Sequence, residues 1–312
     1  MVTTAIETVN LAKIFPGGVQ ALNSLDLNIC TGESVGYLGP NGAGKTTTIQ
    51  IFLNLLRPSS GDVFIFSEQL KGQERKIMRR IGALIELPGF YDNLTPNQLL
   101  RHICRLYRME QGVMNQSIKE ILDLVQLTEV RDRSIGTFST GMRRRLGIAQ
   151  VLVHDPELVI FDEPTNGLDP KGIREIRDLI KTLNKDGKTV FMCSHNLPEV
   201  AEISNRVIFL KNGNVIEDRQ MREFKSRLSS NIIELKFIRS LTEKEKKNLN
   251  SITNVLNVVY DHSIFIEYQG SLDTTHQILQ DLLKYNFPLY YFTPRLMTLE
   301  ELYLQLFGKE VI

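Results

Sequence analysis

The most informative motif of this 312-residue chain is Gly39-Pro40-Asn41-Gly42-Ala43-Gly44-Lys45-Thr46-Thr47. It fits the pattern GxxxxGK[ST], whose glycines let the backbone turn tightly and point its N–H groups into a cradle for phosphate. All nine residues are therefore predicted to contact a nucleoside triphosphate, with Lys45 reaching the outer phosphates and Thr46 holding Mg²⁺. The apolar run at 34–38 predicts a buried strand before the loop, and the pattern at 47–56 predicts a helix after it.

A second motif is an apolar run that ends in two carboxylates, Leu158-Val-Ile-Phe-Asp162-Glu163-Pro164. Such a run predicts a buried strand with the acidic pair at its carboxyl end, where open α/β sheets bind their ligands. We expect Asp162 to hold Mg²⁺, directly or through water. We expect Glu163 to orient and activate the attacking water as a general base.

Strand and helix patterns alternate through the first two thirds of the chain. Period-2 alternation at 25–29 predicts a half-buried strand, and further strands are predicted at 62–66, 158–161 and 189–193. From about 91 to 145 the pattern is helical. Strands that alternate with helices favour a mainly parallel sheet covered on both faces, and the helical stretch is interpreted as a lobe inserted into it.

Composition argues against several classes of protein. The chain has 37 basic and 36 acidic side chains, so no global field draws it to nucleic acid or to a membrane surface. The one basic run, Arg143-Arg144-Arg145, is predicted to be a solvated or salt-bridged helix face. No apolar run approaches the ~20 residues that span a bilayer, and the N-terminus lacks the blocks of a signal peptide. We expect a cytosolic chain that can dock on a membrane protein.

A third motif, Phe138-Ser139-Thr140-Gly141-Met142, lies between the first two along the chain. With it the chain resembles the ATP-binding subunits of ATP-binding-cassette (ABC) transporters, which carry LSGGQ at this place. The serine and the last glycine are kept, whereas Thr140 and Met142 replace Gly and Gln. The resemblance implies that Ser139 and Gly141 contact ATP held by the partner subunit of a dimer, at a helix N-terminus that favours anions.

Further residues follow in the order of that family. Residues 166–169 resemble the D-loop, which runs along the dimer seam, and His195 resembles the switch histidine that contacts the γ-phosphate. Phe15 matches the aromatic residue that stacks on adenine, with a core phenylalanine as the alternative. Glu86 stands where the family usually has glutamine, in a segment that looks like the subgroup associated with bacitracin, lantibiotic and multidrug export. That subgroup often carries Glu there, so Glu86 is expected at the Mg²⁺ site, with a surface glutamate as the alternative.

The predicted fold class is α/β: a P-loop ABC ATPase core with an N-terminal antiparallel β subdomain and an inserted helical lobe. We expect this ATPase domain at 1–220, a charged linker at 221–230 and an accessory domain at 231–312. The accessory domain has the pattern strand, helix, two strands, helix, strand, which is the βαββαβ order of a ferredoxin-like α+β fold. It shows no catalytic constellation.

The resemblance implies an ATPase subunit that powers a separate membrane permease, for export of a drug, an antimicrobial peptide or a lipid-like substrate. ATP and Mg²⁺ would be its cofactors, and a homodimer or pseudo-dimer would sandwich the nucleotides at the cytoplasmic face of the membrane. No nucleic-acid partner and no transmembrane segment of its own are expected.

Other classes are weighed on further sequence features. A soluble ABC ATPase acting on ribosomes usually carries two cassettes, and this chain has one P-loop. A DNA-repair ABC ATPase splits the cassette with a long coiled coil, and no sustained heptads occur here. A sensor subunit that signals the presence of an antibiotic is not separated from an exporter by the sequence.

Overall fold

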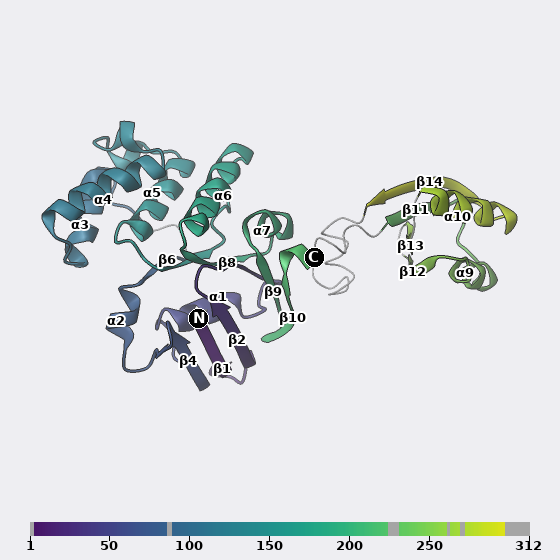
Figure 1. Ribbon diagram of the computed structural model, residues 1–312, viewed down its shortest axis with the longest axis horizontal. Coiled ribbons are helices and arrows are strands. Elements are labelled where there is room, and N and C mark those ends of the chain that lie inside the picture. The colour runs from purple at the N-terminus through teal and green to yellow at the C-terminus, as the bar shows by residue number, and fades with distance from the viewer. Residues whose placement is uncertain (1–2, 86–88, 224–230, 261–262, 269–271, 297–312) are drawn as a thin grey trace. The chain divides into compact units, whose positions relative to one another are not determined.

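The computed structural model describes residues 3–85, 89–223, 231–260, 263–268 and 272–296. The chain divides into two compact units, residues 1–221 and 222–312 (Figure 1). Among the described residues, no helix combines the length and the apolar character needed to cross a membrane.

A six-stranded sheet forms the centre of the first unit, in the order β10-β9-β3-β8-β7-β6. Five strands run parallel, and β10 pairs antiparallel with β9 at one edge. Every residue of β3, β7 and β8 is buried, as expected for strands covered on both faces. The strands are β3 (Ser34–Leu38), β6 (Ile81–Leu84), β7 (Leu158–Asp162), β8 (Thr189–Ser194), β9 (Arg206–Lys211) and β10 (Asn214–Gln220).

Helices and a second sheet cover the two faces of this sheet (Figure 1). On one face lie α6 (Pro170–Lys185) and α7 (Leu197–Ile203), and on the other lies α1 (Lys45–Phe52). Beyond α1 is an antiparallel sheet whose side chains share one core with α1 and the central sheet. Its strands are β1 (Thr4–Ile14), β2 (Gln20–Cys30), β4 (Ser60–Ile65) and the short β5 (Glu68–Gln69).

The predicted helical lobe contains α3 (Pro96–Leu106), α4 (Gln111–Leu124) and α5 (Thr140–Leu152), with short 3-10 turns at Thr128–Val130 and Ile135–Thr137. The short α2 (Glu74–Met78) leads into β6. The start of α3 is fixed by a capping box, in which Thr95 and Gln98 satisfy each other's backbone N–H groups. The apolar face of α4 is buried as its periodicity predicts, at Ile118, Ile121 and Leu122.

The second unit is a four-stranded antiparallel sheet in the order β12-β13-β11-β14, with its own buried core. This order confirms the predicted ferredoxin-like fold. Its core joins residues of strands and helices, including Ile233, Leu249, Ile266 and Leu282. The elements are β11 (Asn231–Phe237), α9 (Glu243–Asn250), β12 (Val255–Tyr260), β13 (Ile264–Tyr268), α10 (Leu272–Lys284) and β14 (Leu289–Leu296).

Candidate nucleotide-binding and hydrolysis site

The glycine-rich stretch forms the turn between β3 and α1, as predicted. Gly42 and Gly44 have φ of 78° and 110°, in the left-handed region that favours glycine. A Cβ on Gly39 would lie 2.3 Å from the carbonyl oxygen of Leu210, so the backbone there needs a residue without a side chain. The Lys45 ammonium donates to the carbonyls of Gly39 (2.6 Å) and Pro40 (3.0 Å), across the loop. A lysine cation therefore stands beside a helix N-terminus, an arrangement suited to phosphate.

Asp162 ends β7 and meets the start of α1. The Thr46 hydroxyl donates to the Asp162 carboxylate at 3.2 Å. Asp162 is buried, whereas Thr46 is exposed, so the pair lies at the surface of the site. Carboxylate, hydroxyl and phosphate oxygens are the ligands that Mg²⁺ prefers, and these two residues fit such an ion.

Glu163 follows β7 directly and is held by the end of the neighbouring parallel strand β8. Its φ of 48° is uncommon for a residue other than glycine. Its N–H donates to the carbonyl of Cys193 at 3.0 Å, and its carboxylate accepts from the Ser194 hydroxyl at 3.4 Å. His195 Nδ1 lies 2.8 Å from the other carboxylate oxygen, and 62% of the His195 side chain is exposed. The structure thus brings together Glu163 and His195 at one edge of the sheet.

Ser139 and Gly141 lie at a different place, the N-terminus of α5. The Ser139 hydroxyl caps the helix by accepting from the N–H of Met142 at 3.3 Å. Ser139 is exposed, and apart from the neighbouring residues and the backbone of α5 itself no described atom lies within 4 Å of a Cβ built on Gly141. Among the described residues, no hydrogen bond links Ser139 to the P-loop of the same chain. The N-terminus of α5 at Ser139 is therefore accessible to solvent.

Two predicted site residues remain, Phe15 and Glu86. Phe15 follows β1 and is half-buried, and its N–H closes a turn on the carbonyl of Val19 at 2.9 Å. The ammonium of Lys13 lies 5.3 Å from the centre of the Phe15 ring. Phe15 is outside the buried core, which weakens the alternative of a core phenylalanine. Glu86 lies outside the described residues, so its predicted place at the Mg²⁺ site stays a prediction.

Comparisons with known proteins identify the family. Residues 22–166 match the family described as ABC transporter. The bacitracin transport ATP-binding protein BcrA of Bacillus licheniformis is 41% identical, covering 72% of this chain and 72% of that protein. The chain belongs to the ABC transporter ATP-binding proteins. The daunorubicin/doxorubicin resistance ATP-binding protein DrrA of Streptomyces peucetius is 35% identical over 80% of this chain and 75% of its own length.

A solved structure agrees with this assignment. The ATP-binding cassette MJ0796, in a dimeric post-hydrolysis structure bound to ADP and Pi, is 28% identical to this chain with a TM-score of 0.62. The match covers 70% of this chain and 99% of that cassette. The predicted ABC ATPase fold and ATPase activity, with ATP as the nucleotide, are confirmed.

The interpretation of Arg143-Arg144-Arg145 as one solvated face was partly wrong. Arg143 forms an ion pair with Asp92 at 2.7 Å at the surface, as predicted. Arg144 is only 8% exposed, and its guanidinium donates to the carbonyl of Asn166 at 3.1 Å. Successive helical residues point in directions about 100° apart, so three in a row cannot share one face. The signal was present, because Arg144 falls on the same helical face as the buried Ile148 and Val151.

Glu199 in α7 was not predicted from the sequence as part of the site. Its carboxyl accepts from the Thr165 hydroxyl at 2.6 Å, and the residue is only 5% exposed. Burial raises the pKa of Glu199. Asn196 caps α7 by accepting from the N–H of Glu199, so the local pattern predicts an exposed acidic residue in a first helical turn. Its contact with Thr165 depends on packing between segments that the pattern does not join.

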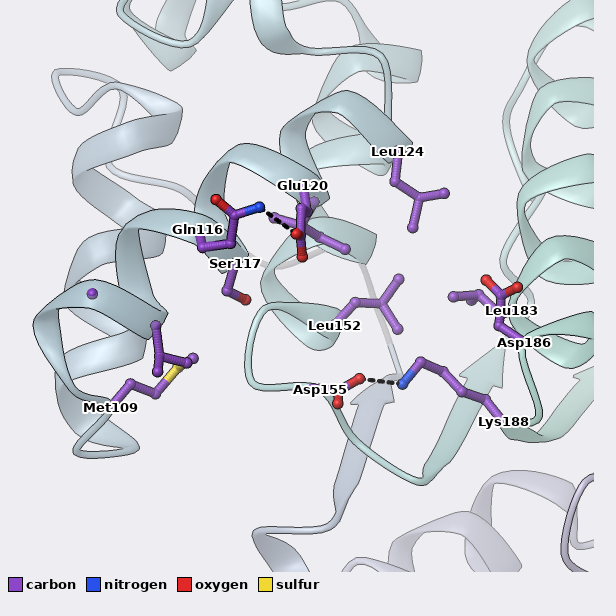
Figure 2. A pocket seen from close by; sticks show the side chains of 13 residues that line it. Met109, Gln116, Ser117, Glu120, Leu124, Leu152, Asp155, Leu183, Asp186 and Lys188 are labelled. Carbon is purple, nitrogen blue, oxygen red and sulfur yellow. Dashed lines mark hydrogen bonds and ion pairs between the residues drawn. The ribbon is translucent and has the colours of Figure 1, made fainter.

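A pocket of about 670 Å³ lies between the helical lobe and the core of this ABC ATPase (Figure 2). It lies near the amino end of β8, where Lys188 donates to Asp155 at 2.6 Å and to the carbonyl of Pro156 at 2.8 Å. Three carboxylates, those of Glu120, Asp155 and Asp186, outnumber the one ammonium in its lining, so the pocket is acidic. Its larger apolar lining residues are Met109, Val113, Ile121, Leu124, Leu152 and Leu183.

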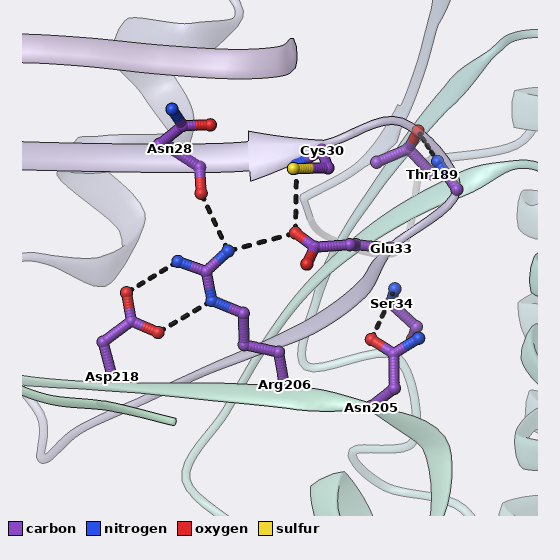
Figure 3. A network of polar contacts seen from close by, with 9 residues as sticks. Asn28, Cys30, Glu33, Ser34, Thr189, Asn205, Arg206 and Asp218 are labelled. Atoms are coloured by element: carbon purple, nitrogen blue, oxygen red, sulfur yellow. Dashed lines mark hydrogen bonds and ion pairs between the residues drawn. The ribbon is translucent and has the colours of Figure 1, made fainter. Parts of the chain in front are cut away.

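The amino end of the central sheet is held by a charged network (Figure 3). Arg206, the first residue of β9, makes two bonds of 2.7 Å to Asp218 in β10. The same guanidinium donates to Glu33 at 3.1 Å and to the carbonyl of Asn28 in β2 at 2.8 Å. Asp218 raises the pKa of Arg206, so the guanidinium stays charged at neutral pH. The network ties the antiparallel sheet to the central sheet.

Proposed function

We propose that this chain is the motor subunit of an exporter, in which ATP hydrolysis drives a separate membrane permease. The observation that carries the proposal is the convergence of Lys45, Asp162, Glu163 and His195 at the carboxyl ends of β3, β7 and β8. The relatives named for bacitracin transport and daunorubicin resistance support a drug, an antimicrobial peptide or a lipid-like molecule as the substrate.

Each residue of the site has a proposed role. The P-loop and Lys45 bind the β- and γ-phosphates, and Phe15 stacks on adenine. Thr46 and Asp162, with Glu86, hold Mg²⁺, which supplies positive charge against the phosphates when it is bound. The Glu163 carboxylate accepts a proton from the attacking water, and His195 both orients that carboxylate and contacts the γ-phosphate.

Two cassettes close on each other in this proposal, either two copies or this chain and a related one. Ser139 and Gly141 of one cassette meet the γ-phosphate of ATP that the other cassette holds. ATP touches both faces only in the closed dimer, so its binding shifts the population from open to closed. Loss of the γ-phosphate removes this contact and reopens the pair.

The acidic pocket between the lobe and the core is the proposed docking place for the permease. Its apolar lining residues and its excess of carboxylates suit a permease helix with an apolar face and basic side chains. Such docking holds this subunit at the cytoplasmic face of the membrane. The ATPase domain at 1–220 then does the chemistry, and the accessory domain at 231–312, beyond the linker at 221–230, serves regulation or docking.

The test traps the closed dimer. Glu163→Gln is expected to bind ATP and to lose at least ~100-fold in turnover, the usual scale for a general base. With Mg²⁺-ATP this variant is expected to accumulate as a dimer in light scattering. Adding Ser139→Arg is expected to return it to monomer, because a bulky cation at that helix end obstructs the seam.

A matched control places the same cation elsewhere. Glu110→Arg puts arginine at the exposed N-terminus of α4 in the same lobe, where no side chain caps the helix, and is expected to leave the dimer intact. Full hydrolysis by the Ser139→Arg variant would contradict the shared site. Undiminished turnover by Glu163→Gln would contradict the proposed base.

A further inference from the structure

The chain turns sharply just after the proposed catalytic base. Glu163 adopts a left-handed conformation, and the N–H of Asn166 donates back to the Glu163 carbonyl at 3.2 Å. The N–H of Leu168 donates to the carbonyl of Thr165, also at 3.2 Å, so residues 163–168 form one continuous turn. A strained backbone of this kind is energetically costly and persists only where its surroundings hold it.

One hydrogen bond that fixes this turn comes from the helical lobe. Arg144 in α5 is 8% exposed, and its guanidinium donates to the backbone carbonyl of Asn166 at 3.1 Å. A buried cation is costly, and an apolar side chain at such a place often stabilises a fold equally well. The arginine is therefore better explained by what it positions than by the stability that it adds.

A second hydrogen bond that fixes the turn comes from the helix that follows His195. Thr165, next to Asn166 in the turn, donates its hydroxyl to the carboxyl of Glu199 at 2.6 Å. Both partners are nearly inaccessible to solvent, with exposures of 6% and 5%. In the protein interior no bulk water competes for such a hydrogen bond or replaces it. Its loss therefore leaves a buried polar group without a partner.

We propose that Arg144 and Glu199 are positioning residues, which clamp the turn at Thr165 and Asn166 from two sides and so fix the Glu163 carboxylate. This inference rests on the proposed role of Glu163 as the base. It has a mechanistic consequence, because one clamp point belongs to α5, whose N-terminus carries Ser139, and the other belongs to α7, which starts beside His195. Movement of the lobe or of the switch histidine would thereby reach the hydrolytic carboxylate within the same chain.

The test separates positioning from binding. Thr165→Val and Arg144→Met are expected to lower kcat for ATP by about 10- to 100-fold, the range for a misplaced catalytic group, with KM changed less than about 2-fold. Thr165→Ser and Arg144→Lys keep a donor and are expected to recover most of the rate. Glu199→Gln keeps an acceptor for Thr165 and is expected to stay close to wild type.

Two further measurements make the result decisive. Arg143→Met, which removes only a surface ion pair of the same helix, serves as the control for α5. The double variant Arg144→Met with Thr165→Val is expected to lose less than the product of the two single losses, because both act through one turn.

Different results would overturn the clamp and the proposed role of Glu163. Wild-type kcat in folded Thr165→Val, or a Thr165→Ser variant as slow as Thr165→Val, would overturn the clamp. If Arg144→Met fails to fold, Thr165→Val and Thr165→Ser still decide. Full activity of Glu163→Gln in the same assay would instead overturn the proposed base, whatever the clamp variants do.

Discussion

The two ends of the central sheet use the same kinds of charged residue in opposite ways. At the amino end, the Arg206 cation is matched by two carboxylates, Asp218 and Glu33. At the carboxyl end, Lys45 is held by the neutral carbonyls of Gly39 and Pro40. A cation paired with carboxylates is largely neutralised, whereas a cation oriented by carbonyls keeps its charge for an anionic ligand.

Backbone geometry follows the same division. The amino ends of β6 and β7 are joined by Arg80 and Glu157, in a two-pronged ion pair of 2.6 and 2.7 Å that lowers the pKa of Glu157. The carboxyl end of β7 instead carries Glu163 in a strained left-handed conformation. One end is arranged to hold the sheet together, and the other end carries a strained backbone and an available charge where we propose that the nucleotide binds.

The largest expected effect is on nucleotide binding at the carboxyl end. Lys45→Ala is expected to weaken ATP binding by at least ~100-fold, because it removes from a nearly buried site the cation that we propose contacts the phosphates. Calorimetric titration with ATP measures it. Lys188→Ala, which removes a lysine near the amino end, is expected to leave the Kd for ATP unchanged. Equal Kd values for the two variants would erase the division between the ends.

The next effect is on stability at the amino end. Arg206→Met leaves the carboxylates of Asp218 and Glu33 close together without their cation. The side chains of Arg206, Asp218 and Glu33 are 15%, 34% and 20% exposed, respectively. Water can therefore partly stabilise the two carboxylates that lose their cation. We expect the free energy of unfolding to fall by about 2 kcal/mol, below the 3–5 kcal/mol typical of a fully buried pair. Urea denaturation measures it, and an unchanged Kd for ATP in the folded variant would separate this end from the site.

Local sequence patterns predicted the parts of the site that local structure encodes. The P-loop follows from its glycine spacing, and the acidic pair follows from the apolar run of β7 before it. The ferredoxin-like order of the second unit also followed from element order alone. Because parallel strands place their carboxyl ends at one edge, the sequence could also predict that Glu163 and His195 share a region, though their 2.8 Å contact comes from the structure.

The contacts that the sequence did not reveal join distant segments. Arg144 reaches Asn166 across 22 positions, and Thr165 reaches Glu199 across 34. Nothing in the spacing of these residues specifies the pairing, because it depends on how α5 and α7 pack around the core. Only the burial of Arg144 could have been predicted from the sequence, because this residue lies on the apolar face of its helix. The order of strands in the central sheet was likewise not determined by the pattern of strands and helices.

Phe15 belongs to neither end of the central sheet, because it follows β1 of the antiparallel sheet. If it stacks on adenine, Phe15→Ala is expected to weaken ATP binding by about 1 kcal/mol or more. Phe15→Tyr and Phe15→Trp keep an aromatic face and are expected to bind normally. An unchanged Kd in folded Phe15→Ala would leave adenine recognition to other residues.

His154 is a titratable residue at the amino end that does not follow this pairing of opposite charges. Its contribution to the pH dependence of stability is the smallest effect that we expect. Its Nε2 lies 3.1 Å from the carbonyl of Ile81, the first residue of β6, and its ring stacks on Tyr107 at 3.9 Å. Its Nδ1 is buried with no hydrogen-bond partner in the part of the chain that the structure describes. Burial lowers the pKa of His154; the hydrogen bond with the Ile81 carbonyl and the charge of Asp155 oppose this shift without reversing it, and the charge of Lys188 adds to it.

The sign of the pH dependence follows from that shift. Above pH 6.5, the ordinary histidine value, the ring is neutral in both the folded and the unfolded chain, and its full contribution to stability is present. As the pH falls below that value the unfolded chain takes up the proton first, so stability decreases until the pH passes the lower pKa of the folded state. His154→Phe keeps the stack on Tyr107 but cannot titrate. Urea denaturation measures the unfolding free energy of both proteins. The value for wild type minus the value for this variant is therefore expected to decrease as the pH is lowered from 7.5 to 5. A constant difference would mean that His154 has the same pKa in the folded and the unfolded chain, and a difference that grows toward low pH would mean that the folded chain binds the proton more tightly. Either result would contradict the lowered pKa of His154.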